Sequence, residues 1–213
     1  WIKITTKDSA TTKDIDVVGK VSVGTSKSSA EKDQEVSVDF TLTNANTNDP
    51  GSYTDREDDV YIEPGERAVV SFADDASDEF TVEFGDDAYF VFNARGQGKL
   101  NLKNNVDFNK EFAAMYDYAN IDFINFVMEP TFNKNGVVYI YADEDAFVYE
   151  VTADGAKEIN GLKWDEDYEA WTFKTRTLKS YAISDVELTE KTVTEDKDDT
   201  TTDGGKENPD TGR

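Results

Sequence analysis

Two short acidic runs are the first groups in this sequence that could do chemistry. Asp143-Glu144-Asp145 and Asp165-Glu166-Asp167 each place two aspartates two residues apart, and carboxylate oxygens are the ligands that Ca²⁺ prefers. Neither run matches the twelve-residue loop of an EF-hand, and acidic runs between strands are more often hydrated hairpin tips. We therefore expect no cofactor and no metal site, with calcium as the alternative at four aspartates: Asp143, Asp145, Asp165 and Asp167.

The residue types that are missing restrict catalysis. The chain contains no histidine and no cysteine, which excludes Ser-His-Asp and Cys-His catalysis, thiolate metal sites and disulfide bonds. Two carboxylates could still hydrolyse a glycosidic bond. However, the chain has 46 aspartates and glutamates, and no spacing singles out a pair of them. We therefore expect a protein that is not an enzyme.

Three aromatic residues around the second acidic run suggest a different chemistry. Trp164, Tyr168 and Trp171 could form a face on which a sugar stacks, while nearby carboxylates accept hydrogen bonds from its hydroxyls. The two tryptophans could instead pair across a hairpin and pack into the core, which we prefer because all-β cores commonly bury their largest rings. Tyr168, at the turn, is then the ring that we expect to be exposed.

β-Strands must position these side chains. In residues 35–43 the apolar side chains alternate with polar ones, so that Val36, Val38, Phe40 and Leu42 fall on one face of a half-buried strand. Similar period-two or β-branched runs occur throughout the chain, at residues 15–23, 67–72, 80–84, 89–92, 137–141, 147–151, 171–175 and 181–188.

Turn-forming pairs separate the strands at short spacing: Pro64-Gly65, Asn135-Gly136, Asp154-Gly155 and Asn160-Gly161. Only residues 109–119 suggest a helix, with Asn109 or Asp107 as its N-cap. Many short strands, hairpin turns and one short helix predict an all-β fold, an antiparallel β-sandwich of immunoglobulin-like architecture.

The helical segment interrupts the strands near the middle of the chain and suggests a domain boundary near Asn104-Asn105. We expect an N-terminal β-sandwich lobe over residues 1–104, a C-terminal β-rich lobe over 105–188 and a disordered linker over 189–213. One elongated sandwich built from the same strands is the alternative.

The net charge argues against two classes of partner. The 46 acidic residues stand against 22 lysines and arginines, a formal net charge of −24. A surface this negative repels nucleic-acid phosphates and anionic lipid, so we expect no nucleic-acid partner. No apolar run approaches the roughly 20 residues that a membrane-spanning helix needs.

The last residues of the chain carry the clearest motif. Residues 189–206 have almost no apolar side chains, so no element here could offset its ordering entropy, and Asn208-Pro209-Asp210-Thr211-Gly212 follows. This pentapeptide resembles the LPxTG-like and NPxTG-like sorting signals of Gram-positive surface proteins. The resemblance implies that a sortase cleaves between Thr211 and Gly212 and joins the Thr211 carbonyl to a cell-wall amine, with Asn208 and Pro209 as recognition residues.

Two alternatives stay open at the motif. Each of its residues is common in turns, so the run could simply be a turn, and asparagine in place of leucine at the first position leaves the sortase class open. Proteins of this family continue into a hydrophobic stretch and a basic tail. We therefore expect contact with the membrane only through such a segment after Arg213.

Together these features predict an extracellular protein anchored to a bacterial cell wall, with sortase and peptidoglycan as partners. We expect a non-enzymatic adhesion or stalk module with an unidentified protein or glycan ligand. The alternative is a carbohydrate-binding or polysaccharide-processing module on the same anchor.

Overall fold

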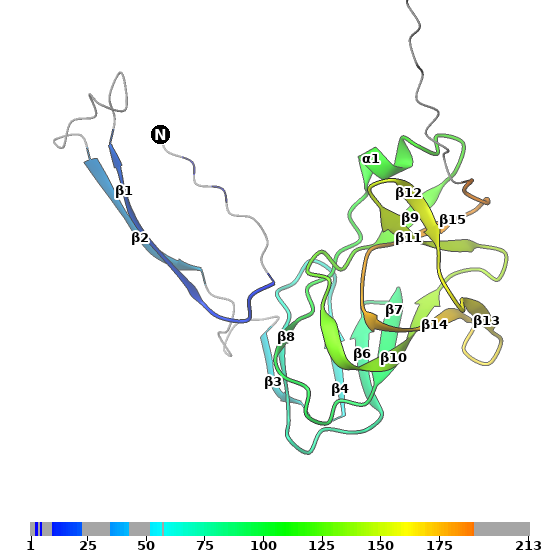
Figure 1. Ribbon diagram of the computed structural model, residues 1–213, viewed down its shortest axis with the longest axis horizontal. Coiled ribbons are helices and arrows are strands. Elements are labelled where there is room, and N and C mark those ends of the chain that lie inside the picture. Colours follow the sequence, from blue (N-terminus) through cyan, green and yellow to red (C-terminus); the bar gives the residue numbers. More distant parts are fainter. Residues whose placement is uncertain are drawn as a thin grey trace, which may run out of the picture.

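The structure is a computed structural model that describes residues 3, 5, 10–22, 35–42, 52–56 and 58–189. These residues form fifteen strands and one short helix (Figure 1). In chain order the elements are β1 (Ile15–Ser22), β2 (Glu35–Leu42), β3 (Ser52–Arg56), β4 (Asp59–Ile62), β5 (Val69–Phe72), β6 (Phe80–Phe84), β7 (Ala88–Phe92), β8 (Leu100–Asn101), α1 (Lys110–Ala113), β9 (Ile121–Ile124), β10 (Thr131–Tyr141), β11 (Phe147–Thr152), β12 (Gly155–Glu158), β13 (Lys163–Asp165), β14 (Ala170–Thr177) and β15 (Tyr181–Ser184).

Three sheets surround one main core. The largest has the strand order β13-β14-β10-β7-β6-β4, the second is β12-β11-β15-β9, and the third is β3-β5-β8. Phe90 of the six-stranded sheet, Tyr181 of the four-stranded sheet and Val70 of the three-stranded sheet belong to the same buried cluster. The prediction of an all-β sandwich with one short helix is therefore confirmed.

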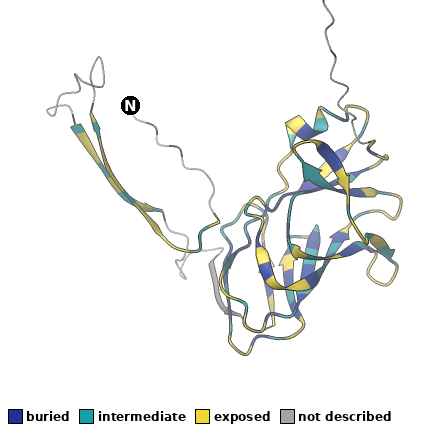
Figure 2. Cartoon of the chain, viewed as in Figure 1, coloured by how far each residue is buried: buried dark blue, intermediate teal, exposed yellow. Residues whose placement is uncertain are grey.

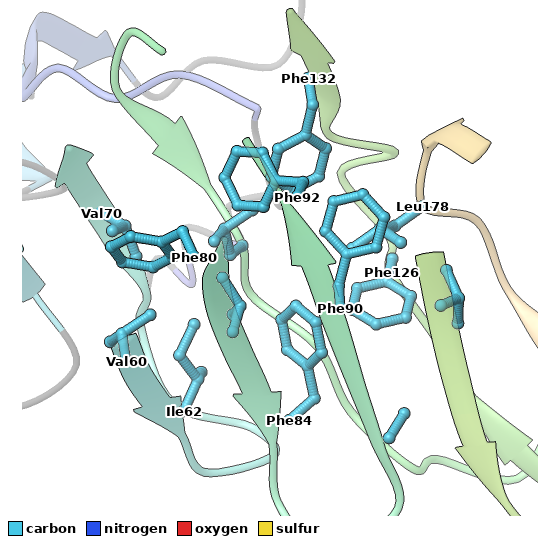
Figure 3. Close-up of a cluster of buried hydrophobic side chains, with 14 of the residues drawn as sticks. Val60, Ile62, Val70, Phe80, Phe84, Phe90, Phe92, Phe126, Phe132 and Leu178 are labelled. Carbon is cyan, nitrogen blue, oxygen red and sulfur yellow. The ribbon is translucent and has the colours of Figure 1, made fainter. Parts of the chain in front are cut away.

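Phenylalanines dominate this core (Figure 3). The ring of Phe92 lies 5.5 Å from that of Phe72, 5.3 Å from that of Phe90 and 4.6 Å from that of Phe132, between centroids. Edge-to-face and offset contacts of this kind add about 0.5–1.5 kcal/mol per pair to the gain from burial. The alternation in residues 80–84 and 89–92 produces this packing, because every second side chain faces inward.

The four-stranded sheet is buried on both faces. Tyr181 faces the main core, whereas Ala182, the next residue of β15, faces a second apolar cluster under α1. Tyr116 belongs to this second cluster, and its hydroxyl accepts a hydrogen bond of 2.7 Å from the amide of Ala156. The molecule thus has a third layer over the outer face of this sheet.

The helix itself is short and begins where the sequence predicts. The Asn109 side chain caps α1 by accepting a hydrogen bond of 3.0 Å from the amide of Phe112. In the part of the chain that the structure describes, no helix has the length and apolar character needed to cross a membrane.

The domain boundary predicted near residue 104 falls inside the sandwich. β7 precedes this point and β10 follows it, yet the two strands pair from Gly136↔Phe92 to Ile140↔Ala88. The rings of Phe90 and Phe132 also meet across it, with centroids 4.6 Å apart. Residues 58–189 therefore share one main core and do not divide into two lobes there.

One predicted turn is wrong. Asn135-Gly136 lies within β10, where the pairing with β14 shifts register between Thr131 and Gly136. The glycine is needed for close packing instead, because a Cβ at this position would overlap the Phe90 ring and the Val91 carbonyl oxygen. The other three pairs lie at turns, and their glycines have positive φ angles of 88° at Gly65, 120° at Gly155 and 74° at Gly161.

Two strand pairs are parallel, although the sequence predicts antiparallel hairpins. β3 pairs with β5 and β4 pairs with β6 in parallel, and every other pair between described strands is antiparallel. β5 lies between β4 and β6 in the sequence but belongs to another sheet. A strand that crosses to the opposite sheet between two neighbours allows them to run in the same direction.

The N-terminal hairpin of β1 and β2 extends away from the sandwich (Figure 1). Its register pairs Ile15 with Leu42, Val17 with Phe40, Gly19 with Val38 and Val21 with Val36, so that one face is entirely apolar. The predicted alternation in residues 35–43 is thus present. Its side chains are exposed or half-buried (Figure 2), with Val36 53% exposed, because the hairpin stands apart from the sandwich core.

Candidate functional site

A row of tyrosines crosses the outer face of the six-stranded sheet. Tyr139 of β10 lies opposite Tyr89 of β7, which lies opposite Glu83 of β6, and Glu83 lies beside Tyr61 of β4. Period-two alternation places these side chains on the face that points away from the Phe90 core. We call this surface the tyrosine face and define it by five residues: Tyr61, Tyr89, Tyr139, Tyr141 and Tyr168.

The central rings of the tyrosine face stack on one another. The Tyr89 and Tyr139 rings are nearly parallel, with centroids 4.3 Å and planes 5° apart. Tyr141 packs on Tyr89 at 5.6 Å, and Tyr168 meets Tyr139 edge-on at 5.1 Å. The two inner rings are therefore held rigidly. Three rings keep more of their surface free, with exposed fractions of 41% for Tyr61, 46% for Tyr141 and 55% for Tyr168.

The hydroxyls of Tyr89, Tyr139 and Tyr141 stay protonated at physiological pH. Burial first, and then the neighbouring phenol and carboxylate groups, raise the pKa of Tyr89 and Tyr139 above the usual 10.0. Burial and the charge of Glu83 raise the pKa of Tyr141 in the same direction. Each of these three phenols is therefore neutral and can both donate and accept a hydrogen bond.

The tyrosine face continues at Tyr141 into a cleft of about 870 Å³. The cleft lies where five chain segments meet: the β6–β7 turn, the start of β9, the β10–β11 loop, the β13–β14 hairpin and the end of β15. We call it the acidic cleft, because its described lining includes seven carboxylates and no lysine or arginine: Asp87, Asp122, Asp143, Glu144, Asp145, Glu169 and Asp185. Tyr141 and Trp164 supply its aromatic walls.

Two carboxylates of the cleft have opposite pKa shifts. Partial burial, reinforced by the charges of Asp86 and Asp122, raises the pKa of Asp87 above 3.8. Asn120 lowers the pKa of Asp185 by donating from its side chain at 2.7 Å and from its amide at 2.9 Å. Asp185 is therefore a fixed anionic acceptor at the cleft wall.

Glu169 reaches the cleft from a backbone conformation that normally favours glycine. Its φ angle of 49° lies in the left-handed region, which carries strain for a residue with a side chain. The β13–β14 hairpin thus places a carboxylate where a glycine would fit more easily.

The two tryptophans pair across a hairpin as predicted, but only Trp171 also packs against the main core, where both were expected. Trp164 and Trp171 are direct partners in the β13–β14 register, with ring centroids 5.8 Å apart. Trp171 packs against the main core and donates through Nε1 to the carbonyl of Asp143 at 3.1 Å. Tyr168 is exposed, as expected. Only Trp164 and Tyr168 are therefore placed to meet a sugar, and Trp171 is structural.

The acidic runs lie at or beside turns, and of the two only the first lines the acidic cleft. Asp143 and Asp145 line the acidic cleft, whereas Asp165 ends β13 and accepts a hydrogen bond of 3.2 Å from the amide of Asp167. Within the described residues, no group of three or more metal-ligating side chains is arranged to hold an ion. The calcium alternative thus has no ready-made site in this region.

The remaining predicted site lies elsewhere in the chain. Asn208, Pro209, Asp210, Thr211 and Gly212 lie outside the described residues, so the sorting motif stays a prediction from sequence. No family model, no curated protein and no solved structure matches this chain. The argument for function therefore depends on the tyrosine face, the acidic cleft and the terminal motif.

Proposed function

We propose that this chain is a non-enzymatic binding module of a Gram-positive cell surface and that it adheres to carbohydrate through the tyrosine face and the acidic cleft. The observation that carries the proposal is the set of partly exposed rings beside carboxylate acceptors: Tyr61 and Tyr141 on the six-stranded sheet and Tyr168 on the β13–β14 turn. Sugar binding was the alternative in the sequence interpretation, and this surface favours it over an adhesin for protein ligands.

The physical fit to a sugar has two parts. The C–H faces of a sugar ring pack on an aromatic face, as Tyr141 and Trp164 offer in the cleft. The sugar hydroxyls donate to carboxylates, and the hydrogen bonds from Asn120 hold the Asp185 carboxylate in place as one such acceptor. Neutral tyrosine hydroxyls can complete the hydrogen-bonding pattern in either direction.

The dimensions of the face suit an extended chain of sugars. Tyr61 lies on β4 and Tyr139 on β10, three strand spacings apart in the sheet order, which is about 14 Å at roughly 4.8 Å per strand. This length exceeds that of one sugar ring. The acidic cleft then holds one end of the ligand and the tyrosine face its continuation.

The terminal motif supports the location. We propose that sortase joins Thr211 to peptidoglycan, with Gly212 as the leaving residue and Asn208 and Pro209 as recognition residues. The threonine-rich, weakly apolar segment from 189 to 206 would then be the linker between wall and sandwich. This placement would present the tyrosine face to extracellular glycans.

A glycan array followed by titration tests the binding site. We expect sugar-dependent binding of the wild-type chain, and a loss of about 10-fold in affinity for Tyr141→Ala or Tyr168→Ala, since one aromatic contact contributes up to about 1.4 kcal/mol. Tyr118→Ala is the matched control, because Tyr118 is 56% exposed but packs on Tyr116, away from the tyrosine face. Binding without sugar dependence, or equal loss in all three variants, would refute the glycan site.

Wall fractionation tests the anchor separately. With the natural C-terminal extension of such a signal in place, we expect the chain to be released only by wall hydrolases, and Thr211→Ala to leave it unattached. Asp210→Ala is the control, because the family tolerates any residue at this position. Identical fractionation of Thr211→Ala and the wild type would contradict the proposed anchoring and would not bear on the proposed glycan site.

A further inference from the structure

The outer edge of β1 is open and carries an unusual exposed residue. β1 pairs only with β2 among the described strands, so its other edge presents unpaired backbone groups that can accept another strand. Val18, in the middle of β1, is 76% exposed and is the most exposed large apolar side chain in the described chain. A two-stranded hairpin is marginal alone, and a wider sheet with an apolar face is stable.

The sequence of β1 is complementary to itself in one antiparallel register. If Val18 lies opposite Val18 of a second copy, Asp16 lies opposite Lys20 of that copy and Lys20 opposite its Asp16. The same register places Ile15 opposite Val21 and Val17 opposite Gly19, so that apolar residues meet on the apolar face. A shift of one residue would pair the apolar face with the polar face, and a shift of two would separate the opposite charges.

This register also keeps the two negatively charged sandwiches of the dimer apart. In this register Ile15 and its counterpart in the second copy are six residues apart along the strand, or about 20 Å at roughly 3.4 Å per residue. The sandwich of each copy lies beyond the Ile15 end of its own β1, so the two sandwiches lie at opposite ends of the paired strands. This separation is more than twice the Debye length of about 8 Å at physiological ionic strength, so the net charge of −24 opposes the contact only weakly.

We propose that β1 is a self-association edge that pairs antiparallel with β1 of a second copy, with Val18 on the two-fold axis. The product is a continuous four-stranded sheet in the order β2-β1-β1-β2 with one apolar face. Lys20 already contacts Glu35 of its own hairpin at 3.1 Å, and in the dimer it gains Asp16 of the second copy. This inference is independent of the glycan site.

Cysteine cross-linking tests the register directly, because the chain has no cysteine of its own. The full chain with Val18→Cys should form a disulfide-linked dimer under mild oxidation, since directly opposed residues of an antiparallel pair bring their Cβ atoms within about 5.5 Å. Ser37→Cys is the control, as an exposed residue on the same face of β2. A monomeric Val18→Cys protein, or equal cross-linking of Ser37→Cys, would overturn the proposal.

Charge reversal in the Val18→Cys protein tests the pairing of Asp16 with Lys20. Asp16→Lys alone and Lys20→Asp alone should each reduce the cross-linked fraction several-fold, because each places like charges opposite one another, and the double reversal should restore it. Lys174→Asp makes the same change in net charge as Lys20→Asp, at an exposed site on the sandwich, and should have no effect. Failure of the double reversal to restore cross-linking above either single variant would refute this register.

Discussion

A single methyl group at Gly136 should destabilise the sandwich strongly. In Gly136→Ala the new Cβ would lie 2.5 Å from the carbonyl oxygen of Val91 and closer still to the ring of Phe90. The Phe90 ring is fully buried and packs on the rings of Phe92 and Phe132, with centroids at 5.3 and 4.6 Å. The carbonyl belongs to the β7 backbone, so neither neighbour can easily retreat.

The expected magnitude follows from this crowding. Forcing a methyl group into a packed core costs about 1–3 kcal/mol, and two rigid neighbours place this change near about 3 kcal/mol. At roughly 2–4 °C per kcal/mol for a chain of this size, the melting temperature should fall by about 6–12 °C. Gly98→Ala is the matched control, because nothing lies within 4 Å of its added Cβ, and we expect a change below about 1 kcal/mol.

Urea unfolding, followed by the fluorescence of the three tryptophans, measures the unfolding free energy of both variants. Adding Phe90→Leu to Gly136→Ala should recover part of the loss, because the smaller side chain vacates the space that the methyl needs, and the two changes should then be non-additive. Unfolding free energies of Gly136→Ala and Gly98→Ala within about 0.5 kcal/mol of each other would refute the reasoning.

Three further outcomes are expected. Tyr116→Phe should lower the unfolding free energy by about 1–3 kcal/mol because it leaves the buried Ala156 amide unpaired, and an effect no larger than that of the exposed Tyr118→Phe would contradict this. Burial raises the pKa of Tyr181, so above about pH 10 the folded state retains a proton that the unfolded state loses. The unfolding free energy should therefore fall as the pH rises further, by up to about 1.4 kcal/mol per pH unit from this group. Tyr181→Phe should flatten that dependence, and an unchanged slope would argue against it. Millimolar calcium should stabilise no more than sodium chloride of equal ionic strength, and a calcium-specific rise lost on changing Asp165 to Asn would contradict that.

The strands were largely predictable because a half-buried strand must alternate. Residues 80–84 and 147–151 therefore predict β6 and β11 almost to the residue. Asn135-Gly136 was misread as a turn because the same dipeptide suits a hairpin and a crowded strand. Only the position of Phe90 on the neighbouring strand distinguishes the two. The boundary near residue 104 was misplaced for a similar reason, since local sequence does not say that β7 pairs with β10.

The candidate site was predictable only in part. The sequence points to the hairpin around Trp164 and Tyr168, because aromatic residues and acids are adjacent there, and the structure places Trp164 in the lining of the acidic cleft. Tyr89 and Tyr139 were recognised only as members of strands, although their outward positions follow from the alternation. Tyr89 and Tyr139 stack because β7 pairs with β10, and local sequence does not show that these two distant segments are neighbours in the sheet.

The position of β15 has a consequence for mechanical load. This strand lies between β9 and β11, hydrogen-bonded along both edges, and the residues after it are held by Asn120 on Asp185 and by the Tyr149 hydroxyl, which accepts from the amide of Leu188 at 3.1 Å. Tension applied beyond Thr189 would therefore reach an interior strand, and not an edge strand that peels away. A pull from the C-terminal side would thus load two hydrogen-bond ladders together.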